Sequence, residues 1–360
     1  MTTATFPLST AARNTMDGLV ASIEANPGRL INPLEMAEAA ERIDVSRVTD
    51  SLPDGLSRED LVEILRLAML TECATESYAD VFREGARTFD APWLARFTDN
   101  VWVPDELTHA MPYKSMLLSL GFSEADLDRQ IAETQGMHYE HCCGKSPVAL
   151  TTYGMIQEQL TDQWHGLIST LVKPAAPYAA HMVNRVKTRE TLHTMWYREM
   201  TVIQVADNPD NLPAVADAIM GFEMPGATLL PDLQEKALVW MPHMKADFRH
   251  VARELVRNFS RIAGSNRRSG ELLTNVAMRR GYSIGPIPLR FARALLSPFH
   301  GLGYQVLGEA IKERVSLPFA SPNDEGPRWT APFRGLRARV RTFVAQRIDL
   351  RAVTGETSAA

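Results

Sequence analysis

The stretch VWVPDELTHAMPYKSML, residues 101–117, holds a glutamate and a histidine three residues apart inside an apolar, helix-like run. Residues at this spacing lie on one face of an α-helix, so Glu106 and His109 can offer a carboxylate and an imidazole to the same metal ion. One such pair is a weak signal, because about half of one match is expected by chance in a chain with nine histidines. The pair indicates a metal site only if further ligands accompany it.

A second pair, Glu190 and His193, lies in VKTRETLHTMWYREM at 186–200. Two other predicted helices each carry a single glutamate among apolar residues, Glu72 in LAMLTECATESY and Glu158 in YGMIQEQLTDQW. The order Glu, Glu-x-x-His, Glu, Glu-x-x-His is the ligand set of ferritin-like di-iron carboxylate bundles. Four carboxylates neutralise and bridge two irons, and the imidazoles complete the coordination. The alternative is that these glutamates are solvated and the histidines are satisfied core residues.

Helical periodicity dominates the chain, and convincing alternating strands are absent. We therefore predict an all-α protein with a ferritin-like four-helix di-iron bundle and extra helices at 1–264. A loop-rich, basic C-terminal extension at 265–360 is expected to pack on the bundle, with a disordered end. The predicted helices are 12–26, 33–42, 58–85, 91–120, 124–134, 148–171, 178–205, 211–222 and 231–264.

Three residues mark predicted helix boundaries. Ser57 with Asp60 has the capping-box spacing that begins a long helix, and Ser123 is expected to cap a later one. Pro104 should kink or restart the helix that contains it, because proline removes a backbone donor and clashes with the preceding turn. In this interpretation both Glu-x-x-His pairs lie inside long helices.

The formal net charge of -5 is unevenly distributed. Residues 245–360 carry 20 Lys and Arg against 9 Asp and Glu, so this part is basic and the remainder is acidic. Such a division suggests an acidic partner for the basic part, although a solvated charged surface explains it equally well.

The composition also excludes several classes of protein. The N-terminus lacks the basic start and apolar core of a signal peptide, and no apolar run approaches the roughly 18 residues that cross a bilayer. Cys73, Cys142 and Cys143 do not make a disulfide framework, which favours a reducing cytoplasm. We expect a cytoplasmic protein whose partners are neither nucleic acid nor membrane.

Other acids and histidines repeat parts of the metal pattern. Glu76 lies one turn after Glu72 and is an alternative to it, whereas His181 should point away from Glu190 on its helix. His138 and His141 lie beside the cysteine pair and are weaker candidates for a second site. Two Asp-x-x-His pairs lack partner helices, so we expect them at the surface or beside the ligands: Asp162 with His165, and Asp247 with His250.

The ligand segments resemble those of the soluble, plant-type acyl-acyl-carrier-protein (acyl-ACP) desaturases, a family of the ferritin-like di-iron carboxylate superfamily. LTECATESY is similar to the family's first ligand segment, VWVPDELTHAMPYKSML to its Trp-containing Glu-x-x-His helix, and YGMIQEQLT to its third ligand segment. FEMPGATLLPDL resembles the segment after the fourth bundle helix. The resemblance covers roughly residues 15–262, and the spacings between the ligands fit it as well.

The resemblance implies two iron ions, with Glu106 and Glu190 as bridging carboxylates. It also implies that Thr161 lies beside the irons and helps to activate oxygen, which makes Thr161 the catalytic candidate. The implied iron ligands are Glu72, Glu106, His109, Glu158, Glu190 and His193.

The implied reaction is desaturation of the acyl chain of an acyl-ACP thioester. O2 is the co-substrate, a ferredoxin supplies electrons, and the products are an alkene and water. A homodimer is implied as well. The acidic carrier protein would meet a basic stripe of arginines four residues apart, although a plain solvated face explains the stripe nearly as well. The stripe consists of Arg249, Arg253, Arg257 and Arg261.

Some positions depart from the family. Arg189 stands where the family has an aspartate that orients the opposite metal histidine, and Thr108 and Leu192 replace arginines. Asp105 keeps the acidic residue before the first motif. Because such carboxylates orient the histidines and tune the metal, Arg189 is expected to alter the redox behaviour of the site.

Three alternative functions use the same ligands. A di-iron hydroxylase or N-oxygenase would oxidise a carrier-bound or free substrate, but the N-oxygenases carry a third histidine at the position of Val186. A ferritin-like ferroxidase needs no organic substrate, but its chains are usually much shorter. A non-catalytic iron-binding paralogue with a structural or regulatory role is compatible with Arg189.

Overall fold

The regular elements of the described residues are helices. The computed structural model describes residues 7–28, 31–137, 139, 144–224, 233–265 and 268. Within these ranges there is no strand, which confirms the predicted all-α class. No helix in the described part has both the length and the apolar character needed to cross a membrane. The extension predicted at 265–360 lies almost wholly outside the described residues, and the four-helix bundle remains a prediction.

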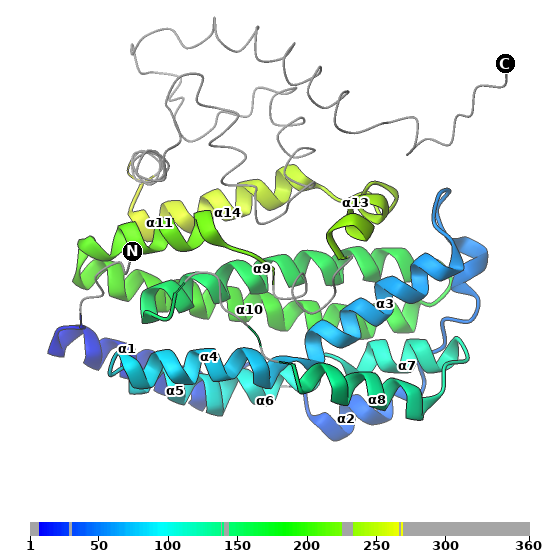
Figure 1. Ribbon diagram of the computed structural model, residues 1–360, viewed down its shortest axis with the longest axis horizontal. Helices are drawn as coiled ribbons and strands as arrows, with labels where there is room; N and C mark the ends of the chain where they lie inside the picture. Colours follow the sequence, from blue (N-terminus) through cyan, green and yellow to red (C-terminus); the bar gives the residue numbers. More distant parts are fainter. Residues whose placement is uncertain are drawn as a thin grey trace, which may run out of the picture.

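Most of the helices are short, and two are much longer than the rest (Figure 1). In chain order they are α1 (Thr10–Ala25), α2 (Pro33–Ala40), α3 (Arg58–Cys73), α4 (Thr75–Thr88), α5 (Pro92–Phe97), α6 (Val103–Glu106), α7 (Met111–Ser119), α8 (Glu124–Gln135), α9 (Pro147–Val172), α10 (Pro177–Asp207), α11 (Leu212–Gly221), α13 (Leu233–His243) and α14 (Phe248–Ala263). Three short elements are η1 (Val48–Ser51), the π-helical turn η2 (Thr98–Trp102) and η3 (Pro209–Asn211).

The two long helices, α9 and α10, lie side by side in the middle of the molecule (Figure 1). A short connection joins them, so they run antiparallel. Next to this connection the Ser169 hydroxyl donates to the Ala180 carbonyl (3.1 Å), and at the far end the Thr201 hydroxyl donates to that of Thr151 (2.8 Å). Both helices match their predicted ranges within two residues, and their middle thirds face each other.

The long helix predicted at 58–85 is wrong, because the chain forms two helices, α3 and α4, separated at Ala74. The capping box of Ser57 and Asp60 at the start of α3 is confirmed. At the break, the Thr75 hydroxyl donates to the Glu72 carbonyl (2.8 Å), a local bond of the kind that competes with helix continuation. Glu72 therefore lies in the last turn of α3 rather than in the middle of a helix.

The single helix predicted at 91–120 is also wrong. The chain forms α5, η2, α6 and α7 in succession, and Pro104 and Pro112 each occupy the first turn of a new helix, where proline is tolerated. Pro104 thus restarts the helix, one of the two outcomes expected. Glu106 is the last residue of α6, and His109 lies in the turn that follows, with its N–H donating to the Glu106 carbonyl (2.9 Å).

Two further helix predictions need correction. The helix predicted at 231–264 is divided into α13 and α14, with Pro242 in the last turn of α13. Proline removes a backbone donor, so a helix does not continue easily past it. Ser123 precedes α8 as expected, but its side chain makes no capping hydrogen bond.

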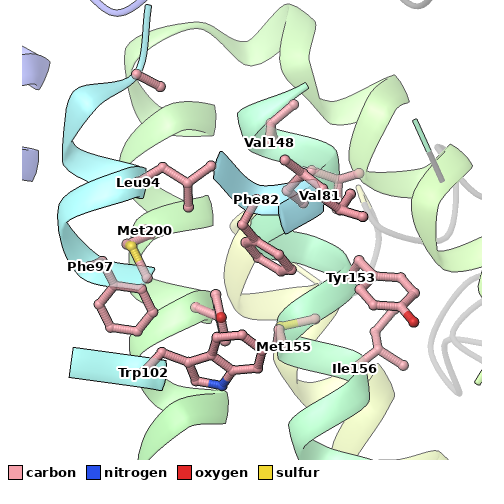
Figure 2. Packing of buried hydrophobic residues seen from close by; sticks show 14 of the residues in the cluster. Val81, Phe82, Leu94, Phe97, Trp102, Val148, Tyr153, Met155, Ile156 and Met200 are labelled. Atoms are coloured by element: carbon pink, nitrogen blue, oxygen red, sulfur yellow. The ribbon is translucent and has the colours of Figure 1, made fainter. Parts of the chain in front are cut away.

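In the part of the chain that the structure describes, buried apolar side chains form two clusters. The first joins α4, α5, the first half of α9 and the second half of α10, and it includes Phe82, Phe97, Tyr153 and Met200 (Figure 2). The second joins α2, α3, α7 and α8 to the opposite ends of α9 and α10. Fully burying one large apolar side chain contributes about 1.5–3 kcal/mol, so both clusters stabilise the fold strongly. The polar residues in the middle of α9 and α10 lie between them.

Candidate metal centre

The six predicted iron ligands come together between the two apolar clusters, and each is at most 6% exposed. Their ligand atoms form two groups, and within each group all atoms lie within 4.8 Å of one another. We call these groups the His109 half and the His193 half. The His109 half is Glu72, Glu106, His109 and Glu190, and the His193 half is Glu106, Glu158, Glu190 and His193.

Glu106 and Glu190 belong to both halves. One oxygen of Glu106 lies 3.3 Å from Nδ1 of His109, and its other oxygen lies 2.8 Å from Nδ1 of His193. Glu190 likewise directs one oxygen to His109 Nδ1 (2.7 Å) and the other to His193 Nδ1 (3.7 Å). This is the arrangement required of carboxylates that bridge two cations, the role predicted for both residues.

Each half also has a carboxylate of its own. Glu72 Oε2 lies 3.7 Å from His109 Nδ1, and Glu158 Oε2 lies 3.6 Å from His193 Nδ1. Each half thus offers one imidazole, one carboxylate that belongs to that half alone, and two carboxylates that belong to both halves. Four carboxylates cancel the charge of two divalent ions, which removes the free-energy cost of burying them unpaired.

Several ligand atoms are buried and make no hydrogen bond of acceptable geometry within the described part of the chain: Nδ1 of His109, Nδ1 of His193, Oε1 of Glu106 and Oε1 of Glu190. A buried polar atom without a partner costs about 1–3 kcal/mol, and more if it is charged. Cations bound between these unpaired ligand atoms would satisfy them. The residues therefore fit a pair of divalent metal ions.

The electrostatics of the metal-free site lead to the same conclusion. Burial, together with the charges of Glu106 and Glu190, raises the pKa of Glu158 well above its usual range. Burial lowers the pKa of His109, but Glu106 and Glu190 more than offset this and raise it well above its usual range. Without metal the cluster thus retains protons, and a bound cation would replace them.

Behind the His193 half lies a buried ion pair. Asp105 Oδ2 lies 2.9 Å from His193 Nε2 and accepts a hydrogen bond from Arg189 Nε (2.6 Å). Although burial raises it, the hydrogen bond with His193 lowers the pKa of Asp105 to about 2. Arg189 also donates to the Pro27 carbonyl (2.9 Å), and its guanidinium lies 5.5 Å from the centre of the Trp196 ring. Arg189 thus binds the aspartate of the other motif.

Among the residues that the structure describes, the His109 half has no equivalent of this ion pair. Nε2 of His109 makes no hydrogen bond to any described residue. His165 is fully buried instead, and its Nε2 lies 3.3 Å from Glu72 Oε1 and 3.5 Å from Glu190 Oε1. Of the two positions expected for His165, the one at the surface is wrong and the one beside the predicted ligands is confirmed. The sequence could have indicated this position, because His165 follows Glu158 by seven residues. The two residues therefore lie two turns apart on the same face of α9.

Two side chains hold ligand carboxylates from outside. Trp102 Nε1 donates to Glu158 Oε1 (3.0 Å), and the Thr161 hydroxyl lies 3.2 Å from Glu190 Oε2. Thr161 also reaches the Glu158 carbonyl (3.0 Å), as a helical threonine commonly does. Thr161 therefore lies beside Glu190, one of the two carboxylates predicted to bridge, and its catalytic role remains a prediction.

A small cavity adjoins the ligand carboxylates. It measures about 20 Å³, counted as the space open to the centre of a water-sized sphere. One water needs about 10–15 Å³ by this measure, so the cavity fits a molecule the size of water or O2. Besides the ligand carboxylates it is lined by Thr71, Thr75, Tyr78, Gln157, Thr161 and Met224.

Several other candidates do not join the site. Glu76 is half exposed and pairs with Arg83 (2.7 Å), so it does not replace Glu72. His181 is exposed, as predicted from its angle on the helix. Asp162 is buried but pairs with Lys187 (2.9 Å) rather than with a ligand.

The remaining candidates lie on α14 or outside the described residues. Asp247 and His250 are exposed, and the Asp247 carboxylate accepts a hydrogen bond from the His250 N–H (3.0 Å) at the start of the helix. Arg253, Arg257 and Arg261 are exposed, and each has an acidic neighbour within 4 Å. His138, His141, Cys142, Cys143 and the Arg249 side chain lie outside the description.

No protein-family model matches the chain, and no curated protein matches it with significance. The similarity to the acyl-ACP desaturases therefore rests on the ligand residues and their flanking sequence.

Proposed function

We propose that the chain is an O2-dependent di-iron oxidase that desaturates the acyl chain of an acyl-ACP thioester. The observation that carries the proposal is the pair of ligand groups that share Glu106 and Glu190. Two shared carboxylates with one imidazole and one private carboxylate per half are typical of di-iron sites in helical proteins. When bound, two ferrous ions supply electrons and open coordination positions for the reduction of O2.

The residues of the chain have three tasks in this proposal. The six ligands fix the two ions, and their burial between two apolar clusters keeps bulk water away. The cavity beside Thr161 offers room for O2. The Thr161 hydroxyl lines this cavity within reach of Glu190 Oε2, so it is placed to pass a proton between that carboxylate and a molecule in the cavity.

The acyl carrier protein and a ferredoxin-type reductant belong to the same proposal, as does a homodimer. The exposed arginines of α14, Arg253, Arg257 and Arg261, are a suitable surface for an acidic carrier. Their acidic neighbours would be displaced or retained at the edge of such an interface. The similarity of the ligand segments to acyl-ACP desaturases supports the choice of substrate.

The test is a turnover assay with defined components. The purified protein is loaded with Fe(II) without oxygen and then mixed with O2, a reductase–ferredoxin pair and acyl-ACPs, and the acyl products are read by mass spectrometry. Loss of two hydrogen atoms from the chain supports the proposal. Full iron loading without product, under conditions in which an authentic desaturase turns over, contradicts it.

A second candidate is hydroxylation or another oxygenation at the same centre. It is favoured by the polar part of the cavity lining, where Thr71 and Gln157 accompany Thr161, because hydroxyl and amide groups suit a polar substrate or product. The same assay distinguishes the two, since hydroxylation adds one oxygen atom to the product. Free acids and amines should be included as substrates.

A further inference from the structure

His165 is a buried imidazole that the six-ligand site does not use. It lies on α9, two turns beyond Glu158, and is fully buried. Its Nε2 makes no hydrogen bond of acceptable geometry within the described residues, yet it faces Glu72 Oε1 at 3.3 Å and Glu190 Oε1 at 3.5 Å. A fully buried nitrogen that points between two carboxylates without bonding to either requires an explanation.

The two predicted histidine ligands show the same geometry. Nδ1 of His109 and Nδ1 of His193 also lie close to carboxylate oxygens without a hydrogen bond to them. Two atoms that bind one metal ion at about 2.0–2.2 Å and at right angles are about 3 Å apart. The distances from His165 Nε2 to Glu72 Oε1 and to Glu190 Oε1 are close to this separation. The carboxylates that His165 faces are Glu72 and Glu190, which both belong to the His109 half.

The other nitrogen of His165 is held by Tyr113. Its Nδ1 contacts the Tyr113 hydroxyl, and Tyr113 is itself fully buried on α7, with its ring stacked on the imidazole at 5.6 Å. Histidines that bind metal almost always engage the second ring nitrogen in this way, because the contact fixes the ring and its tautomer. With the proton on Nδ1 and donated to Tyr113, Nε2 keeps a lone pair that faces the carboxylates.

We infer that His165 is a third imidazole ligand, bound through Nε2 to the metal ion of the His109 half. The inference rests on the di-metal centre of the proposed function and adds a residue to it. One ion then has two imidazoles and the other has one, so the two metal positions are chemically different. His165 lies on α9 and faces Glu190 of α10. Val186, the position at which the N-oxygenases carry a third histidine, lies on α10 instead.

The inference can be tested with Co(II) as a probe, without turnover. Two Co(II) ions are bound to the full chain, and the strongly shifted, exchangeable N–H protons of metal-bound imidazoles are counted by proton NMR in water. The wild type should show three such signals, and His165→Gln should show two. His181→Gln, which changes an exposed histidine on α10, is the matched control and should keep three.

Metal affinity provides an independent readout. Competition with a chelator should show that His165→Gln lowers the affinity for one of the two Co(II) ions by about 100-fold. The affinity for the other ion should be nearly unchanged. Tyr113→Phe keeps His165 and covers the case in which His165→Gln does not fold. It should lower the affinity for the same ion by about 10-fold, since residues that hold the second nitrogen of a metal-bound histidine contribute about 10–100-fold to metal affinity. One N–H signal should also exchange faster with water.

The results that would overturn the role of His165 differ from those that would overturn the proposed function. Two strongly shifted signals in the wild type would mean that His165 only donates a hydrogen bond to Glu72, and this outcome overturns the inference while the metal centre stands. The same conclusion follows if His165→Gln and Tyr113→Phe both match the wild type in signals and in affinity. A wild type that binds no Co(II) and no Fe(II) overturns the di-metal centre and the proposed function with it.

Discussion

The two halves of the candidate metal centre share Glu106 and Glu190 but differ in the residues that lie behind their histidines. In the His193 half, Nε2 of the histidine meets Asp105, which is paired with Arg189. In the His109 half, Nε2 of the histidine makes no hydrogen bond within the described residues, and His165 stands beside the carboxylates. One half is held by an ion pair and the other faces an additional imidazole.

This difference shows what one residue beside a motif can do. Arg189 neutralises the charge of Asp105, so the carboxylate withdraws less of the proton from the imidazole of His193 than a free carboxylate would. Nε2 of His109 has no such partner within the described residues. Ligands of the same type in both halves thus acquire different surroundings, and the two metal positions are expected to differ in affinity and redox potential.

The largest effect should come from removing a residue that both halves share. Glu106→Ala deletes one bridging carboxylate and leaves His109 and His193 without their common partner. We expect bound iron to fall far below two per chain, measured by metal analysis after anaerobic loading. Wild-type protein should gain about 2.7 kcal/mol of unfolding free energy per site at a free Fe(II) concentration of 100 times Kd, and chelation should remove this gain.

The control for this experiment is Glu76→Ala, which removes an exposed carboxylate one turn beyond Glu72. It should bind iron like the wild type. If Glu106→Ala keeps full occupancy at both positions, the assignment of Glu106 as a shared ligand is wrong.

The next largest effect should be specific to the His193 half. Arg189→Leu leaves the buried Asp105 carboxylate without its guanidinium partner, and breaking one side of a buried ion pair destabilises by about 3–5 kcal/mol. Urea unfolding of the metal-free protein measures the change. Arg185→Leu, on the same helix and with only a loose pairing to Glu35 (3.8 Å), should change stability by less than about 1 kcal/mol.

A double variant sharpens this prediction. Adding Asp105→Asn to Arg189→Leu removes the uncompensated charge, so part of the lost stability should return. Strictly additive losses in the two variants would argue against coupling between Arg189 and Asp105.

A smaller effect is expected for Trp102→Phe, which removes the donor to Glu158 but keeps an aromatic ring in the first apolar cluster. In the iron-loaded protein, where the cations would keep Glu158 charged, stability should fall by about 1.5–3 kcal/mol, because this is the contribution of a hydrogen bond to a charged group. Chelator competition should show weaker binding of the ion in the His193 half alone. Trp164→Phe, a partly buried tryptophan of α9, is the comparison, and an equal loss there would deny a special role to Trp102.

The smallest change in stability should come from Thr161→Val, about 1 kcal/mol, because it removes one hydroxyl that bonds to Glu190. Iron content should stay at the wild-type level while product formation falls. Thr170→Val removes an exposed hydroxyl from the same helix and should leave turnover unchanged. Normal turnover in Thr161→Val would show that this hydroxyl has no catalytic role.

Much of the site could be predicted because it depends on the spacing of residues within single segments. A spacing of three residues puts Glu190 and His193 on one face of α10 wherever that helix lies, and the same logic applies to the lone glutamate of α9. The prediction of a long helix through 58–85 failed because periodicity does not record a side chain that competes with the backbone, as Thr75 does. The helix through 91–120 is interrupted where Pro104 and Pro112 begin new helices. Glu106 and His109 still meet, because the turn after α6 keeps a similar spacing.

The all-α class and the six candidate metal ligands could be predicted from the sequence, since both depend on spacing within single segments. How these residues pair across segments depends on the tertiary structure. It joined Arg189 to Asp105 and brought His165 from α9 toward Glu72 of α3. Contacts between segments depend on how buried side chains pack, and packing is settled by the whole core rather than by any motif.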